Sequence, residues 1–186
     1  LPFGLEIQQV NNQWQAAVIN AGEKITLDEV YLEGDSIRIV MHIFDTELHA
    51  KISDEKLTGY FIKNYERSYR LPFTATPGDT HRYVKPESIT TNDFSGTYAL
   101  EFQSLIERYP SVGIFKQEGN SVTGTFLTPT GDYRYLQGNI INNELLLSTF
   151  DGNHAFVFRA HMEGDSLKGN FYSGNASLES FKGIKI

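Results

Sequence analysis

Apolar and polar residues alternate along most of the chain, and this pattern predicts β-strands. The clearest case is residues 94–102, where Phe94, Tyr98 and Phe102 share one face and Glu101 lies on the other. A period of two is typical of a strand with one buried face. The same alternation recurs in residues 37–41, 122–126, 156–162 and 167–171. The sequence therefore predicts an all-β protein.

Helix signals are scarce. The best candidate is 104–109, where Leu105 and Ile106 precede Arg108, but Pro110 ends it at once. Proline is poorly tolerated inside a helix, so a loop or a single turn is the favoured interpretation.

Turn residues separate the expected strands at short, regular intervals. They are Gly34-Asp35, Gly119-Asn120, Asn142-Asn143, Asp151-Gly152, Gly164-Asp165 and Gly174-Asn175. Asn, Asp and Gly tolerate the positive φ of tight hairpins, and consecutive hairpins make an up-and-down meander. Closure into a barrel would remove exposed strand edges. We therefore expect antiparallel, barrel-like meanders of the lipocalin or avidin kind.

The two halves of the chain resemble each other, which indicates an internal repeat. Phe44-Asp45 followed by Leu57-Thr58-Gly59-Tyr60-Phe61 parallels Phe150-Asp151 followed by Leu167-Lys168-Gly169-Asn170-Phe171. Phe3 to Ile7 likewise parallels Tyr98 to Phe102. We expect a first repeat at 1–84, a linker at 85–93 and a second repeat, an eight-stranded meander, at 94–186. The repeats either pack as one unit or form two barrels.

Composition narrows the possible functions. The chain is 40% hydrophobic and 13% aromatic, which is enough for a packed core, and its net charge is −7. An acidic chain without a Lys/Arg cluster is not expected to bind nucleic acid. The absence of cysteine excludes a CxxC pair, a thiolate metal site and a Cys nucleophile within these residues. No signal peptide or membrane-length apolar run is evident, and the chain begins with Leu-Pro-Phe, which suggests a boundary inside a longer protein.

The most distinctive segment is 128–136, which reads Thr-Pro-Thr-Gly-Asp-Tyr-Arg-Tyr-Leu. If a strand follows the Thr-Gly-Asp turn, Tyr133 and Tyr135 share one face and Arg134 lies on the other. Tyr and Arg are frequent at interaction hot spots, so Asp132, Tyr133, Arg134 and Tyr135 are a candidate partner-binding face, joined by Tyr172. The alternative places both rings in the core and pairs Arg134 with a carboxylate.

Asp151 and His154 are a second candidate pair, assigned to the same binding face. A carboxylate beside an imidazole can support acid–base chemistry, as in a hydrolase. No recognisable nucleophile accompanies them, and Asp151 is expected instead to bond its own turn. The five histidines show no metal-ligand spacing, so no metal, catalytic residue or cofactor is predicted.

Several motifs resemble the β-rich region that precedes the thioredoxin-like domain of TlpA/ResA-type redoxin proteins of the bacterial envelope. They are residues 124–138, 150–156 and 169–174 in the second half, and Asn20-Ala21-Gly22-Glu23, Gly34-Asp35 and 70–75 in the first. The resemblance implies a secreted or lipid-anchored parent, a thiol–disulfide oxidoreductase of the periplasm, whose CxxC motif lies further C-terminal. For this chain it implies a non-catalytic accessory domain. Its expected partner is the parent's thioredoxin-like domain or a protein substrate of that domain.

The fold-level likeness to calycin barrels gives an alternative function. A stand-alone barrel of this kind would bind a small apolar ligand in an open cavity at one barrel mouth. A barrel filled with Phe and Tyr side chains would count against it.

Overall fold

The computed structural model describes residues 1–27, 29–78, 81–87, 92–175 and 177–186. Apart from one short 3-10 helix, η1 (His42–Phe44), the described elements are all β-strands. The first half contains β1 (Gly4–Val10), β2 (Gln13–Asn20), β3 (Glu23–Leu27), β4 (Val30–Glu33), β5 (Ser36–Met41), β6 (Thr46–Ser53), β7 (Lys56–Lys63) and β8 (Arg70–Ala75). The all-β prediction is confirmed.

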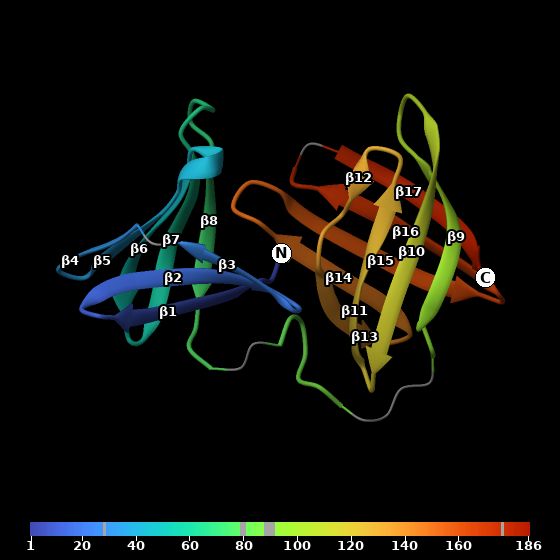
Figure 1. The fold of residues 1–186 in the computed structure, drawn as a ribbon, viewed down its shortest axis with the longest axis horizontal. Coiled ribbons are helices and arrows are strands. Elements are labelled where there is room, and N and C mark those ends of the chain that lie inside the picture. Colours follow the sequence, from blue (N-terminus) through green and yellow to red (C-terminus); the bar gives the residue numbers. More distant parts are fainter. Residues whose placement is uncertain (28, 79–80, 88–91, 176) are drawn as a thin grey trace.

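The second half is a closed antiparallel barrel (Figure 1). Its strands are β9 (Gly96–Gln103), β10 (Arg108–Glu118), β11 (Ser121–Thr128), β12 (Gly131–Asp132), β13 (Leu136–Ile141), β14 (Glu144–Phe150), β15 (Ala155–Glu163), β16 (Ser166–Ser173) and β17 (Ser177–Lys185). β10 pairs with both β9 and β11, and β17 pairs with both β16 and β9. Except for the two-residue β12, these strands form one continuous ring. The predicted eight-stranded meander is therefore confirmed.

Aromatic side chains fill the barrel. Tyr98, Phe102, Phe126 and Phe158 have at most 1% of their surface exposed. Phe126 and Phe158 stack with ring centroids 4.6 Å apart. Inward-facing glycines make room for these rings: a Cβ on Gly169 would lie 2.5 Å from the ring of Phe181. The interior is a packed core rather than a chamber.

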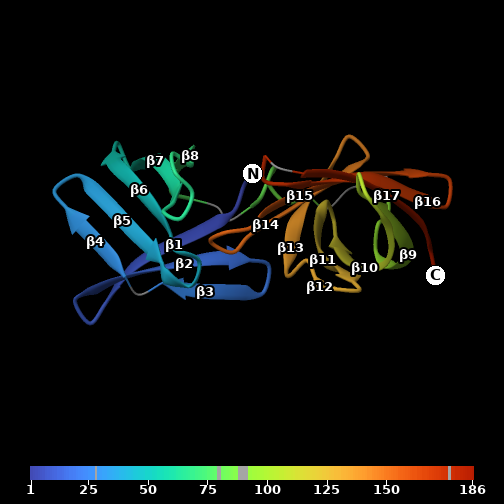
Figure 2. The same ribbon diagram turned by 90° about the horizontal axis from the view of Figure 1, so that it is seen from above.

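The first half forms two sheets that face each other, of order β1-β2-β3 and β4-β5-β6-β7-β8 (Figure 2). Compared with the barrel ring, the described residues of this half lack two pairings, between β3 and β4 and between β8 and β1. The proposed repeat fits this order, because Leu57 to Phe61 lies in β7 and Leu167 to Phe171 in β16, each the seventh strand of its half when β12 is left out. Pro72 lies on the edge strand β8, where a missing N–H costs no ladder bond.

The two halves share a buried, hydrogen-bonded interface. Asn20, at the end of β2, is fully buried; its amide donates to the carbonyl of Phe150 at 2.7 Å and accepts from the Phe150 N–H at 3.2 Å. Within the first half, Arg82 is 6% exposed and supports Asn20 by donating to its side-chain oxygen at 2.8 Å. Ser148 donates to the carbonyl of Pro2 at 2.7 Å. Buried bonds of this kind hold the halves in one arrangement.

Phe150 belongs to the barrel strand β14 but completes the core of the first half. It is 3% exposed, and its ring lies 4.6 Å from that of Phe3 and 5.3 Å from that of Phe61. The turn that follows it, between β14 and β15, reaches toward the first half in Figure 1. Thr46 donates a hydrogen bond to the Gly152 carbonyl in this turn at 2.5 Å.

Most local predictions agree with this structure. The predicted tight turns lie between strands, including Asn142 and Asn143, which have φ of 51° and 65°. The 104–109 segment is a bend followed by the start of β10, as the loop interpretation required. In the expected linker 85–93, residues 88–91 lie outside the described residues. In the described part, the Lys85 carbonyl accepts from the Asn120 amide at 3.2 Å, which ties this segment to the barrel.

Candidate functional site

The segment 128–136 turns sharply between β11 and β13. The Thr128 hydroxyl donates to the carbonyl of Gly131 at 2.8 Å and closes the turn. Residues 133–135 are not in a strand, and Arg134 has a left-handed backbone with φ of 60°. The expectation that Tyr133 and Tyr135 share one face was therefore wrong, because a left-handed residue between them breaks the strand alternation. Their side chains go to different surroundings.

Tyr133 points into the barrel mouth. Its ring centroid lies 4.7 Å from that of Phe171 and 5.4 Å from that of Phe156. Its hydroxyl is 3.0 Å from that of Tyr109, which itself donates to a Glu179 carboxylate oxygen at 2.5 Å. Burial raises the pKa of Tyr133, and burial together with the bond to Glu179 raises the pKa of Tyr109 strongly. Both rings are partly buried and pack against the aromatic core of the barrel.

Arg134 reaches across to the first half. Its guanidinium pairs with the carboxylate of Glu23, at the start of β3, and its Nε lies 3.9 Å from the Asp151 carboxylate. The Asp151 side chain is 4% exposed and that of Glu23 is 18% exposed. The Arg134 side chain is therefore fixed between the carboxylates of Glu23 and Asp151 by charge as well as by hydrogen bonding. The alternative interpretation, in which Arg134 pairs with a carboxylate, describes this contact.

Asp151 and His154 do form a close pair. Asp151 accepts hydrogen bonds from the backbone N–H groups of Asn153 at 2.9 Å and His154 at 2.7 Å, and lies 3.0 Å from the His154 Nδ1. Burial alone would raise the pKa of Asp151, but the bonds from His154 and Asn153 hold it below its usual value. The other ring nitrogen of His154 lies 3.5 Å from the Asn153 amide nitrogen rather than against a hydroxyl nucleophile. Asp151 therefore bonds the backbone of its own turn, as the sequence predicted.

Tyr172 does not join the Asp132–Tyr135 segment. It lies on β16 and lines a separate hollow on the outside of the barrel, whereas Asp132, Arg134 and Tyr135 line a cleft between the halves. The predicted single face is thus divided into two surfaces, with Tyr133 on neither.

The cleft between the halves has a volume of about 610 Å³. Ala21 and Gly22, in the β2–β3 turn, line it from the first half, and outward residues of β10 and β11 line it from the barrel. Tyr135 is 54% exposed and Ile114 is 43% exposed. Lys116, Asp132 and Arg134 add charge to this mainly apolar lining. We call this surface the inter-half cleft.

Sequence reasoning missed the contribution of the first half to this cleft. Its first-half residues lie more than a hundred positions earlier in the chain than the segment around Arg134. The Glu23–Arg134 ion pair, for example, joins residues 111 positions apart. No local pattern marks such a contact.

The barrel interior bears on the calycin-like alternative. The residues that line the described hollows belong mainly to outer faces, and the inward residues of the ring form the packed aromatic cluster.

Within the described ranges, no group of three or more His, Asp or Glu side chains is placed to hold a metal ion. Among those same residues, no helix is long and apolar enough to cross a membrane.

Comparisons of the chain with protein-family models, with curated proteins and with solved structures gave no match.

Proposed function

We propose that this chain is a non-catalytic, partner-binding accessory module of a TlpA/ResA-type thioredoxin-like oxidoreductase of the bacterial envelope. Its partner is the thioredoxin-like domain of the same parent, or a protein substrate of that domain, and the partner docks at the inter-half cleft. The observation that carries the proposal is the exposed pair Tyr135 and Ile114 beside the held ion pair of Arg134. Tyr and Arg are enriched among the anchors of protein interfaces, and surrounding apolar groups exclude water from them.

The rigid frame supports a docking role. Asn20 and Ser148 join the halves through hydrogen bonds to Phe150 and Pro2, so the two walls of the cleft keep their spacing. A preformed surface binds without ordering its own backbone, which reduces the entropic cost of association. The packed barrel core favours binding at an outer surface over binding inside.

Two experiments test the proposal. The first reads the gene downstream of Ile186: a CxxC motif within a thioredoxin-like domain is expected, and a stop codon without one would remove the proposal. The second titrates that redox domain onto this chain by calorimetry. Tyr135→Ala and Ile114→Ser should each weaken binding by on the order of tenfold or more, since interface anchors of this size carry about 1.4 kcal/mol or more.

A matched control is Ile184→Ser. Ile184 is 54% exposed on the outside of β17, so it resembles Ile114 in type and exposure but does not line the cleft. Its replacement should leave binding unchanged. Equal losses from Ile114→Ser and Ile184→Ser, or no binding at all, would rule out the cleft as the docking surface.

A further inference from the structure

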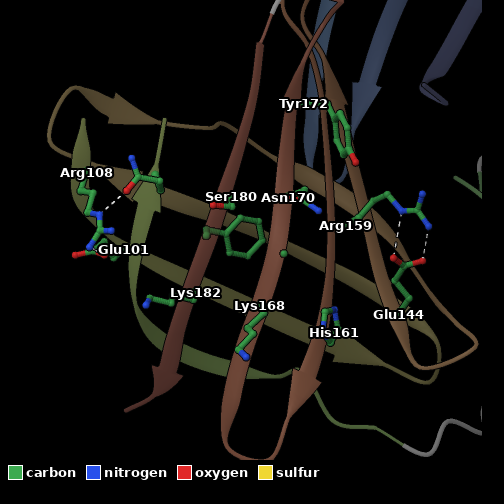
Figure 3. Close-up of a pocket in the computed structure, with 13 residues that line it drawn as sticks. Glu101, Arg108, Glu144, Arg159, His161, Lys168, Asn170, Tyr172, Ser180 and Lys182 are labelled. Carbon is green, nitrogen blue, oxygen red and sulfur yellow. Dashed lines mark hydrogen bonds and ion pairs between the residues drawn. The ribbon is translucent and has the colours of Figure 1, made fainter. Parts of the chain in front are cut away.

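A hollow of about 560 Å³ lies on the outer face of the barrel, across β9, β10, β14, β15, β16 and β17. Figure 3 shows Lys168 and Lys182 beside each other on adjacent strands, with Tyr172 toward the opposite end of β16. The Glu101–Arg108 and Glu144–Arg159 pairs flank the two sides in the same view. We call this surface the barrel hollow.

Strand register arranges the polar side chains of the barrel hollow in two cross-strand rows. Each residue faces the next directly across a strand pair. One row is Glu101, Lys182, Lys168, His161 and Glu144, and the other is Gln103, Ser180, Asn170 and Arg159. Side chains opposed in this way have Cβ atoms about 4.5–5.5 Å apart, and diagonal neighbours, two residues further along a strand, lie about 7–8 Å apart. The two rows are two residues apart along each strand, so both can contact one small ligand.

The lining of the barrel hollow has four cationic side chains, Arg108, Arg159, Lys168 and Lys182, against two carboxylates, Glu101 and Glu144, in a chain whose net charge is −7. In the first row Lys168 faces Lys182, and like charges directly opposed are unfavourable. Glu163 pairs with Lys168. Glu101, opposite Lys182, lies 3.7 Å from Arg108 instead. Across the described ranges, Lys182 has no carboxylate within ion-pair distance, so the face keeps an uncompensated cation that an anionic ligand would neutralise.

The second row offers uncharged hydrogen-bonding groups. Asn170 and Ser180 are exposed, and their side chains make no hydrogen bond with any residue that the structure describes. Beside them, Arg159 donates to both carboxylate oxygens of Glu144, at 3.2 and 2.7 Å. An Arg donor next to a Glu acceptor matches neighbouring hydroxyl groups, each of which both donates and accepts. The half-buried Tyr172 adds an aromatic ring at the edge.

The barrel hollow does not suit an extended peptide. Each of its six strands is already paired on both sides, so no backbone edge is free for strand addition. Among the described lining residues, the large apolar side chains are the Tyr172 ring and Phe181, which is 3% exposed. Peptide recognition without either backbone pairing or apolar pockets would lack its usual sources of affinity.

We propose that the barrel hollow binds a short acidic oligosaccharide, a chain of hydroxylated rings that carry carboxylates. A carboxylate would lie between Lys168 and Lys182. Ring hydroxyls would meet Asn170, Ser180 and the Arg159–Glu144 pair, and the face of one ring would pack on Tyr172. This site is separate from the inter-half cleft and does not depend on the proposed accessory role.

The test is calorimetric titration of the whole chain with trigalacturonate at low salt, and in parallel with its fully methyl-esterified form. The ester keeps the skeleton and removes the charge. We expect the acid to bind, the affinity to fall as ionic strength rises, and the ester to bind on the order of tenfold more weakly. Lys182→Gln and Asn170→Ala should each weaken binding of the acid by about tenfold.

Three controls make the result decisive. Lys51→Gln removes the same charge from a side chain that is 74% exposed in the first half, and should have no effect. Tyr135→Ala should also leave saccharide binding intact, which separates this site from the cleft. Tetraglutamate should bind clearly more weakly than the trisaccharide. The proposal is overturned if the acid gives no heat at millimolar concentration, if Lys182→Gln and Lys51→Gln behave alike, or if tetraglutamate binds as well.

Discussion

Replacing Phe150 with alanine should destabilise the first half of the chain although Phe150 belongs to the barrel. Its ring is 3% exposed and packs on Phe3 and Phe61, both from the first half. A buried Phe removes roughly 150–250 Å² from water, which at about 25 cal/mol per Å² stabilises the fold by about 4–6 kcal/mol. Alanine keeps part of this burial, so we expect a loss of about 3–5 kcal/mol.

Urea unfolding can locate that loss. The chain has a single tryptophan, Trp14, which lies in β2 of the first half. With an m-value of about 2 kcal/mol per M, the midpoint followed by Trp14 fluorescence should fall by about 2 M in the Phe150→Ala variant. Circular dichroism should show the barrel strands unfolding at the same or higher urea concentration.

The control is Ile184→Ala, on the exposed outside of β17, which should shift neither signal by more than about 0.5 kcal/mol. If Phe150→Ala moves the Trp14 transition by less than about 1 kcal/mol, the ring does not hold the halves together. The view of the first half as a core completed by the barrel would then fail.

Three further predictions follow from single residues. Tyr133→Ala should lower the unfolding free energy by about 3 kcal/mol or more because its ring lies in the barrel core, whereas Tyr135→Ala, on an exposed ring, should change it by under about 0.5 kcal/mol in the same denaturation assay. The lowered pKa of Asp151 stabilises the fold at pH values above the usual carboxyl pKa of about 3.9, and this contribution is lost as pH falls through the lower folded-state pKa. Asp151→Asn should therefore be less stable at neutral pH, and its unfolding free energy should fall less steeply with decreasing pH than that of the wild type. In Gly138→Ala the new Cβ would lie 1.7 Å from a backbone carbonyl oxygen of β14, so the melting temperature should drop by several degrees or more, while Gly22→Ala, with no atom within 4 Å, should melt like the wild type.

Local chemistry predicted the fold well. Pairs such as Asn142-Asn143 and Gly164-Asp165 mark hairpins because few other residues accept a positive φ, and the alternation around Phe158 identifies the inward face of β15. The sequence did not indicate that the first half would stay open between β8 and β1. Phe150 of the barrel completes the core of this half, and a contact between residues so far apart in the chain leaves no local pattern.

The candidate site was harder to predict. Strand periodicity assumes an unbroken strand, and nothing in Tyr-Arg-Tyr announces the left-handed backbone of Arg134. The carboxylate that holds Arg134 belongs to Glu23, and such distant pairing has no local signature. The two rows of the barrel hollow also depend on strand register, which becomes known only when the ring closes.

The left-handed turn at Arg134 has a mechanical consequence. In three consecutive residues the chain sends one side chain into the barrel core, one into the interface between the halves and one to the solvent at the cleft. One peptide unit separates each environment from the next, so a backbone shift at any of them is transmitted to the other two. A molecule that binds in the cleft beside Tyr135 would therefore also move the ring of Tyr133 against the Phe side chains of the barrel.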